Sequence, residues 1–214
     1  MDEDISIIDT NTRNEKIKNF FIKNKKYLIT ILSLIILIIF LYFGYAEMQD
    51  RKTKNLSEKY NSIVVNFNAS NKQIFKKELE EIINIKDATY SPLALYFIID
   101  NEIQSSSEEI NKFFDTIINE ANLDKEIKNL IIYKKALYNA DFETESNLIN
   151  ILKPVINSNS VWKSHALYLI AEYFFDKNEK QKAKEFYNQI LNFEKSNESI
   201  VIETQRRLNR DFSE

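Results

Sequence analysis

The 214-residue chain has no cysteine, one histidine, one glycine and two prolines. The absence of cysteine excludes a disulfide framework, a thiol nucleophile and a thiolate-bound zinc ion. A single histidine, His165, argues against an imidazole-based metal site. A single glycine, Gly44, excludes the glycine-rich loops that hold phosphates and dinucleotides. The sequence therefore argues against an enzyme, and we expect no catalytic residue, cofactor or metal.

The charge balance is nearly neutral, with a formal net charge of −3 and a pI near 5.5. Proteins that bind nucleic acid usually carry a basic patch or stripe, and this composition provides none. We therefore expect protein partners and no nucleic acid.

Residues 27–46, YLITILSLIILIIFLYFGYA, carry no charge. As a helix rising about 1.5 Å per residue they span roughly 30 Å, the thickness of a bilayer's hydrocarbon core. Tyrosines stand near both ends, where amphipathic rings favour the interface. A buried helix of a soluble core and a cleaved signal peptide are the alternatives. A signal peptide has an apolar stretch of about 7–15 residues and a small-x-small cleavage site. The stretch at 27–46 is longer, and Gly44-Tyr45-Ala46 is a poor match to such a site. We therefore favour an uncleaved transmembrane anchor in contact with lipid.

Basic residues near the apolar stretch predict its orientation, because the more basic flank stays in the cytoplasm. Six precede it and four follow it within equal windows: Arg13, Lys16, Lys18, Lys23, Lys25 and Lys26, then Arg51, Lys52, Lys54 and Lys59. We therefore predict a cytoplasmic segment at 1–26, a transmembrane helix at 27–46 and a periplasmic domain at 47–214. The protein would be a single-pass protein of the bacterial inner membrane.

The remainder shows one apolar pattern in three full copies and a weaker fourth, with apolar residues at i, i+3, i+4, i+7 and i+8, the spacing of one helix face. In the weaker copy, which starts at Phe75, Glu78 stands at i+3. The four copies start at Phe75, Ile110, Leu148 and Ala183. A second helical segment precedes each copy. One small or apolar residue of that segment stands twelve positions before each starting residue: Ile63, Ile98, Ala136 and Ala171.

This phase predicts helical hairpins at 54–86, 91–121, 125–157 and 161–194, with a capping helix at 197–211. Ser91-Pro92 is expected to cap and open a helix, and Ser105–Ser107 to precede another. One hairpin cannot bury its apolar stripe alone, so stacked hairpins would form a continuous core. The predicted fold class is all-α, a single transmembrane helix followed by an α-solenoid of about four hairpins. An ordinary helical bundle is the alternative.

The fourth hairpin resembles a tetratricopeptide (TPR) repeat. Lys195 replaces the usual terminal proline, and in the third hairpin Lys135 and Asn139 stand where the TPR pattern has apolar residues. The matching positions are Leu167, Ile170, Ala171 and Phe174 in the first helix, and Ala183, Tyr187 and Ile190 in the second.

The layout of short charged segment, single span and TPR-like domain is similar to the YfgM-like family, ancillary subunits of the bacterial Sec translocon. The resemblance implies periplasmic repeats that contact the translocon, a membrane-anchored prolyl isomerase or exported clients. The expected function is that of a scaffold or chaperone accessory in protein export, acting by protein–protein interaction. The alternative is an anchored TPR adaptor in another envelope process, such as cell-wall or outer-membrane assembly.

In a TPR stack the first helices of the hairpins line the concave face, which suggests where a partner would bind. Tyr60, Leu95, Tyr133 and Tyr168 occupy equivalent positions there and would offer a ladder of tyrosines to an extended polypeptide. The alternative is that these rings pack between helices. His165 and Phe175 project to the same face as Tyr168. His165 could act as a pH-sensitive contact or be an ordinary surface residue.

Overall fold

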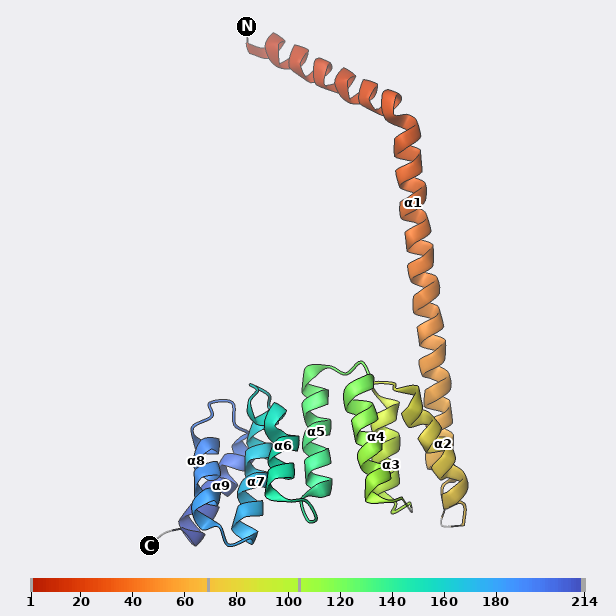
Figure 1. The fold of residues 1–214 in the computed structure, drawn as a ribbon. Coiled ribbons are helices and arrows are strands. Elements are labelled where there is room, and N and C mark those ends of the chain that lie inside the picture. The colour runs from red at the N-terminus through yellow and green to blue at the C-terminus, as the bar shows by residue number, and fades with distance from the viewer. Residues whose placement is uncertain (1, 69, 104, 213–214) are drawn as a thin grey trace. The chain divides into compact units, whose positions relative to one another are not determined.

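The computed structural model describes residues 2–68, 70–103 and 105–212, with side chains described from Asn14 onward. These residues form helices joined by short loops, and no strand occurs among them (Figure 1). The chain divides into two compact units, residues 1–58 and residues 59–214. The expectation of an all-helical protein is confirmed.

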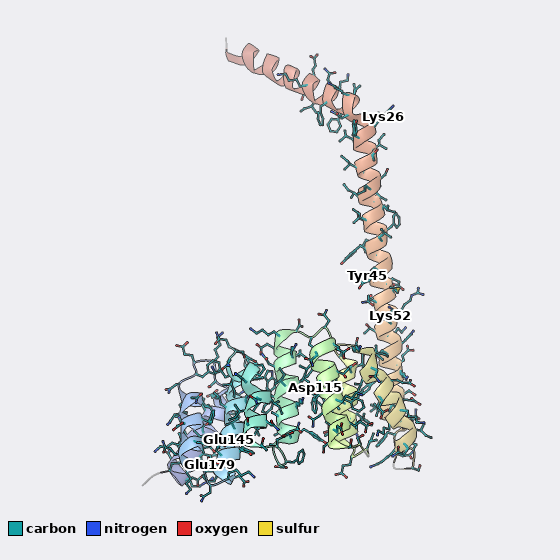
Figure 2. All side chains as sticks on the ribbon, viewed as in Figure 1. Lys26, Tyr45, Lys52, Asp115, Glu145 and Glu179 are labelled. Carbon is teal, nitrogen blue, oxygen red and sulfur yellow. The ribbon has the colours of Figure 1, made fainter. Side chains whose placement is uncertain are left out.

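The first unit belongs to one long helix, α1 (Asp2–Asn66). By length and composition, α1 is the one helix in the described part of the chain that is able to cross a membrane. Its most apolar window has a mean hydropathy of 2.6, and none of that window is buried in the structure. Lys26 and Tyr45 mark the two ends of the uncharged stretch in Figure 2. Because the stretch is uncovered, it is not the core helix of this protein.

In its described residues the second unit contains the end of α1 and eight further helices, which match the predicted helical segments to within a few residues. They are α2 (Lys72–Ile85), α3 (Tyr90–Asp100), α4 (Ser107–Glu120), α5 (Lys125–Asn139), α6 (Glu145–Ile156), α7 (Lys163–Asp176), α8 (Lys180–Leu191) and α9 (Glu198–Asp211).

The buried residues follow the predicted phase. Ile63, Ile98, Ala136 and Ala171, which set the phase of the odd-numbered helices, are all 0–1% exposed. In α4 all five pattern residues are buried, whereas Leu191 at the end of the α8 pattern is exposed. Phe75, Ile151, Ile156 and Phe186 are half-buried. The apolar spacing therefore marks the buried side of each helix, with its outer positions only partly covered.

From α2 onward each helix packs on the next, and several alternate helices also touch: α2 with α4, α5 with α7 and α7 with α9. Polar contacts join alternate helices at a recurring distance along the chain. The separations are 33 residues for Lys76–Glu109, 34 for Glu126–Ser160, 37 for Glu145–Lys182 and 35 for Glu172–Arg207.

The start of α3 differs from the prediction. Ser91 does not cap the helix: it lies in the first turn, is buried, and its hydroxyl donates to the carbonyl of Ile82 at 2.8 Å. The side chain of Asp87 takes the expected role, accepting from the backbone N–H groups of Thr89 and Tyr90, each at 2.8 Å. Pro92 does lie in the first turn, where a missing N–H is tolerated.

Three helices end on non-glycine residues in the left-handed region, Lys86, Glu102 and Asn178. At the end of α3 the N–H of Ile103 donates to the carbonyl of Ile98 at 3.0 Å, and Glu102 N–H donates to Ile99 at 3.1 Å. This is the Schellman arrangement, which is completed by apolar contact between residues such as Ile98 and Ile103, both buried here. Glycine is the residue that favours the central position.

We expect Glu102→Gly to raise the free energy of unfolding by about 0.5–1 kcal/mol, because relief of left-handed strain outweighs glycine's extra chain entropy. Asn178→Gly is the matched control and should gain less, since asparagine tolerates this conformation better. Denaturant unfolding of the two variants measures the difference. A loss of stability in Glu102→Gly would contradict the assignment.

Candidate functional site

Tyr60, the first of the predicted partner-binding residues, lies half-buried among other rings. Its ring centroid is 5.9 Å from that of Tyr90 and 6.3 Å from that of Phe97. Burial, assisted by the negative charge of Asp100, raises the pKa of the Tyr60 hydroxyl. Leu95, at the equivalent position of α3, is fully buried and belongs to the core.

Tyr133 and His165 come together around the chain's single tryptophan. The rings of Tyr133 and Trp162 stack with centroids 6.0 Å apart, and His165 lies 5.0 Å from Trp162 and 5.8 Å from Tyr133. We call Tyr133, Trp162 and His165 the tryptophan cluster. Tyr133 comes from α5, whereas the other two residues stand at the start of α7.

A carboxylate at the start of α5 holds this cluster together. Glu126 accepts from the Ser160 hydroxyl at 2.6 Å and from the Val161 N–H at 3.3 Å. The Ser160 hydroxyl oxygen in turn accepts from the N–H of Trp162 at 3.1 Å. These bonds fix the loop before α7 against α5, so Trp162 meets Tyr133.

The environment of His165 favours its neutral form. Its Nδ1 atom is buried and makes no hydrogen bond of good geometry. Burial lowers the pKa of His165 below its ordinary value of 6.5, and the nearby backbone of Val161 opposes that shift. Burial also raises the pKa of the Tyr133 hydroxyl. The cluster is therefore uncharged near neutral pH.

Tyr168 and Phe175 belong to a different group, at the contact of α7, α8 and α9. Tyr168 lies 5.8 Å from Tyr187, and Phe212 lies 5.9 Å from Tyr187 and 5.8 Å from Phe175. The guanidinium of Arg207 stands 5.0 Å from the centroid of the Phe175 ring. We call this set the α7–α9 cluster.

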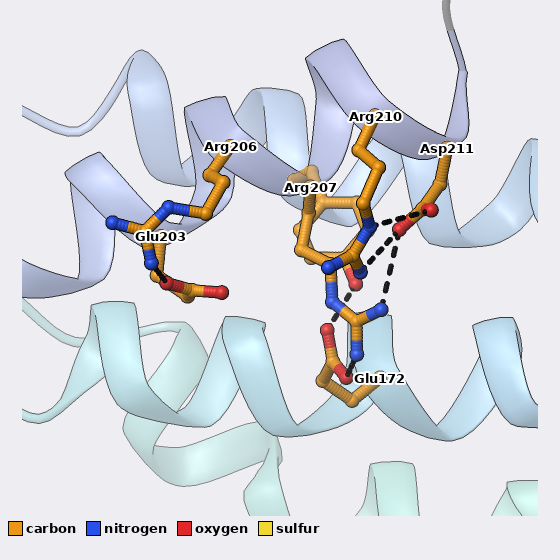
Figure 3. Close-up of polar contacts among 7 residues, drawn as sticks. Glu172, Glu203, Arg206, Arg207, Arg210 and Asp211 are labelled. Carbon is orange, nitrogen blue, oxygen red and sulfur yellow. Dashed lines mark hydrogen bonds and ion pairs between the residues drawn. The ribbon is translucent and has the colours of Figure 1, made fainter.

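Glu172 is the polar centre of the α7–α9 cluster (Figure 3). Its carboxylate accepts hydrogen bonds from the Tyr187 hydroxyl and from Arg207. Arg207 also contacts Asp211 at 3.2 Å, and Arg210 donates to Asp211 through two nitrogens at 2.8 Å. The side chains of Arg207 and Glu172 are only 21% and 28% exposed.

These contacts shift the pKa values in directions that favour the ion pairs. The hydrogen bond from Arg210 is the main cause that lowers the pKa of Asp211, to about 2. Burial, with the Glu172 hydrogen bond, raises the pKa of Tyr187. Both oxygens of Glu172 already accept hydrogen bonds, so this carboxylate serves to join α7 to α8 and α9 and is poorly placed to accept a substrate proton.

The predicted partner-binding residues thus fall into three separate places. The structure brings together Tyr133 with His165, and Tyr168 with Phe175, but no ring contact joins Tyr60, Tyr133 and Tyr168 to one another in its described residues. The contribution of Arg207 and Phe212 is absent from the sequence-based prediction. The spacing of 35 residues between Glu172 and Arg207, one repeat, is the signal that would have indicated it.

A wide, polar hollow of about 730 Å³ lies between α2 and α4, lined by charged side chains such as Lys76 and Glu109. Two smaller cavities lie between successive odd-numbered helices. One, of about 240 Å³, is lined by residues of α3 and by Tyr138 of α5. The other, of about 260 Å³, is lined by Asp141 just after α5 and by residues of α7 such as Tyr173. Both are smaller than the roughly 300–1,000 Å³ of small-molecule sites. Their size suits single side chains of a partner.

Among the side chains that the structure describes, no group of three acidic or histidine residues is arranged to hold a metal ion. Comparisons of the chain with protein-family models, with curated proteins and with solved structures find no match.

We expect the stability of the second unit to fall as the pH drops below 6.5. Between pH 6.5, the ordinary pKa of histidine, and the lower pKa of the folded state, the unfolded chain takes up a proton on His165 while the folded protein keeps it neutral. The contribution of neutral His165 to the free energy of unfolding is therefore lost as the pH falls through this range. Trp162 emission, measured against pH in the full chain, reports this titration because a protonated imidazole quenches a neighbouring indole. His165→Gln should remove both the emission change and the slope of stability. A titration midpoint at or above 6.5 would contradict the burial of His165.

We expect Arg207→Met to lower the free energy of unfolding by about 1–2 kcal/mol, because it leaves the partly buried Glu172 carboxylate without its cation. Arg206→Met is the matched control on the same helix. Arg206 pairs with Glu203 but is 63% exposed, so its loss should change stability by less than about 0.5 kcal/mol. Equal losses in thermal unfolding would show that the α7–α9 cluster carries no special role.

Proposed function

We propose that this protein is a membrane-anchored, TPR-like scaffold or chaperone accessory that works by binding other proteins during export through the Sec translocon. Residues 1–26 would lie in the cytoplasm, 27–46 in the inner membrane and 47–214 in the periplasm. In this proposal the protein acts by binding and not by catalysis.

The observation that carries the proposal is the regular contact between alternate helices. Hydrogen bonds and ion pairs recur at separations of 33 to 37 residues, and α1, α3, α5 and α7 each bury one residue of the predicted phase. Repeat proteins stack units of 20–45 residues so that each contacts only its neighbours. These features support a TPR-like stack over an irregular bundle.

The tryptophan cluster is the proposed contact surface. Tyr133, Trp162 and His165 are half-buried, so each offers apolar area while its position is already fixed by packing. Rigid aromatic anchors contribute strongly to binding because little side-chain entropy is lost. An apolar segment of a translocon subunit, a prolyl isomerase or an exported client is the proposed partner.

The anchor would supply the rest of the binding energy by tethering. A module held at the membrane meets a neighbouring membrane machine at a high effective concentration, so weak individual contacts are sufficient. This mechanism requires a single uncharged span and a binding surface outside the membrane. It requires no deep pocket.

A photoreactive amino acid at Tyr133, introduced into the full chain in its native membrane, tests the proposal. We expect cross-links to translocon subunits, to the prolyl isomerase or to newly exported chains. A control with the same amino acid at Asn150, an exposed position on α6, should give none of these products. Capture at Tyr133 of a single cell-wall or outer-membrane assembly protein would support the adaptor alternative. Equal capture at both positions would contradict the assigned surface.

A further inference from the structure

The thirteen residues before the uncharged stretch, Asn14–Lys26, combine strong positive charge with exposed aromatic rings. They contain five lysines against one acidic residue, Glu15, a formal charge of +4. Among the described residues no acidic side chain forms an ion pair with any of these lysines. We call Asn14–Lys26 the lysine segment.

The lysine segment is amphipathic except at Ile22, which is 64% exposed and lies outside the apolar arc. Successive residues of a helix are rotated by about 100°, which places Ile17, Phe20 and Phe21 within one arc of roughly 100° with Asn24 near its centre. These three apolar side chains are 48%, 57% and 56% exposed. The lysines flank this arc on both sides: Lys18 and Lys25 on one, Lys16 and Lys23 on the other, with Lys26 on the far side.

This arrangement is that of a helix lying in a membrane interface. Such helices place aromatic and aliphatic side chains at the boundary of headgroups and acyl chains, and keep lysines on the polar face. Long lysine stems allow the ammonium groups to reach lipid phosphates while the helix stays at that depth. Clustered lysines beside a span are also attracted to the negative surface of anionic lipids.

From these observations we propose that the lysine segment binds an anionic phospholipid surface, with Ile17, Phe20 and Phe21 inserted at the interface and the lysines on lipid phosphates. The proposal rests on the insertion of residues 27–46 in the membrane, which is part of the proposed function. It adds a second membrane contact with a preference for lipid charge.

Continuity with the apolar stretch favours lipid over a protein partner. Lys26 is followed directly by Tyr27, where the uncharged stretch begins. A thirteen-residue helix is about 20 Å long, so no part of the segment can lie more than about 20 Å from the start of the span. An excess of positive charge next to apolar rings complements an anionic bilayer, which offers phosphates and acyl chains together.

The absence of cysteine makes site-specific labelling direct, because any single introduced cysteine is unique in the chain. We would attach an environment-sensitive fluorophore to Asn24→Cys, on the apolar arc, and to the matched control Asn19→Cys. These two asparagines are separated by about 140° around the helix. A third label at Leu37→Cys reports the uncharged stretch itself. The full-length protein is reconstituted in phosphatidylcholine vesicles with and without phosphatidylglycerol, and quenched by lipid-attached or water-soluble quenchers.

We expect lipid-attached quenchers to act on the Asn24→Cys label and water-soluble quenchers on the Asn19→Cys label, with the contrast greater when phosphatidylglycerol is present. Phe20→Ser with Phe21→Ser should abolish the contrast. Lys18→Gln and Lys25→Gln should each lower the ratio of bound to free segment about fivefold in phosphatidylglycerol vesicles. In phosphatidylcholine alone they should have little effect.

One outcome would overturn this inference alone and leave the anchor intact. In it, lipid-attached quenchers reach the Leu37→Cys label, but water-soluble quenchers act equally on the Asn24→Cys and Asn19→Cys labels. Binding that does not depend on phosphatidylglycerol would overturn the assigned lipid charge. Failure of lipid quenchers to reach Leu37→Cys would overturn both the inference and the anchor in the proposed function.

Discussion

The helices of the second unit are too short to bury an apolar stripe against a single neighbour, and this constraint organises the whole unit. Helices such as α4 and α6 have 14 and 12 residues and carry apolar residues over most of one side. Each packs on the next helix along the chain, and several also reach the next but one. Fully buried alanines, Ala136, Ala171 and Ala183 among them, let backbones approach closely. The half-buried aromatic rings of the candidate surface lie at the edges of this core.

Apolar periodicity predicts the helices well because it reports which side of each helix must be buried. It fails where a polar residue finds a distant partner. Ser91 has the sequence signature of a cap, yet its hydroxyl bonds to Ile82 of the preceding helix, and Asp87 caps instead. Asn139 departs from the TPR pattern because its amide exchanges two hydrogen bonds of 2.8 Å with Asn111, 28 residues earlier. No local pattern indicates that pairing.

The candidate site is less predictable, since it depends on contacts between helices. Projection of single helices places Tyr60, Tyr133 and Tyr168 in one row, but each ring takes its neighbours from a different pair of helices. Tyr133 reaches His165 only because Glu126 holds the loop before α7. Phe175 meets Phe212 beside the hydrogen bond that joins Glu172 to Arg207 of α9. The residue types were visible in the sequence, whereas their grouping required the packing.

The recurring separation of contacts along the chain also bears on how the protein is made. In the second unit, ion pairs and side-chain hydrogen bonds such as Lys76–Glu109, Glu172–Arg207 and Glu145–Lys182 join positions 33 to 37 residues apart. Each stretch of about one repeat therefore finds its partners as soon as the following stretch is available, without waiting for the C-terminus. Chains dominated by short-range contacts fold quickly. A domain of this kind can acquire its structure progressively, from its N-terminal end onward, while the rest of the chain is still being synthesised.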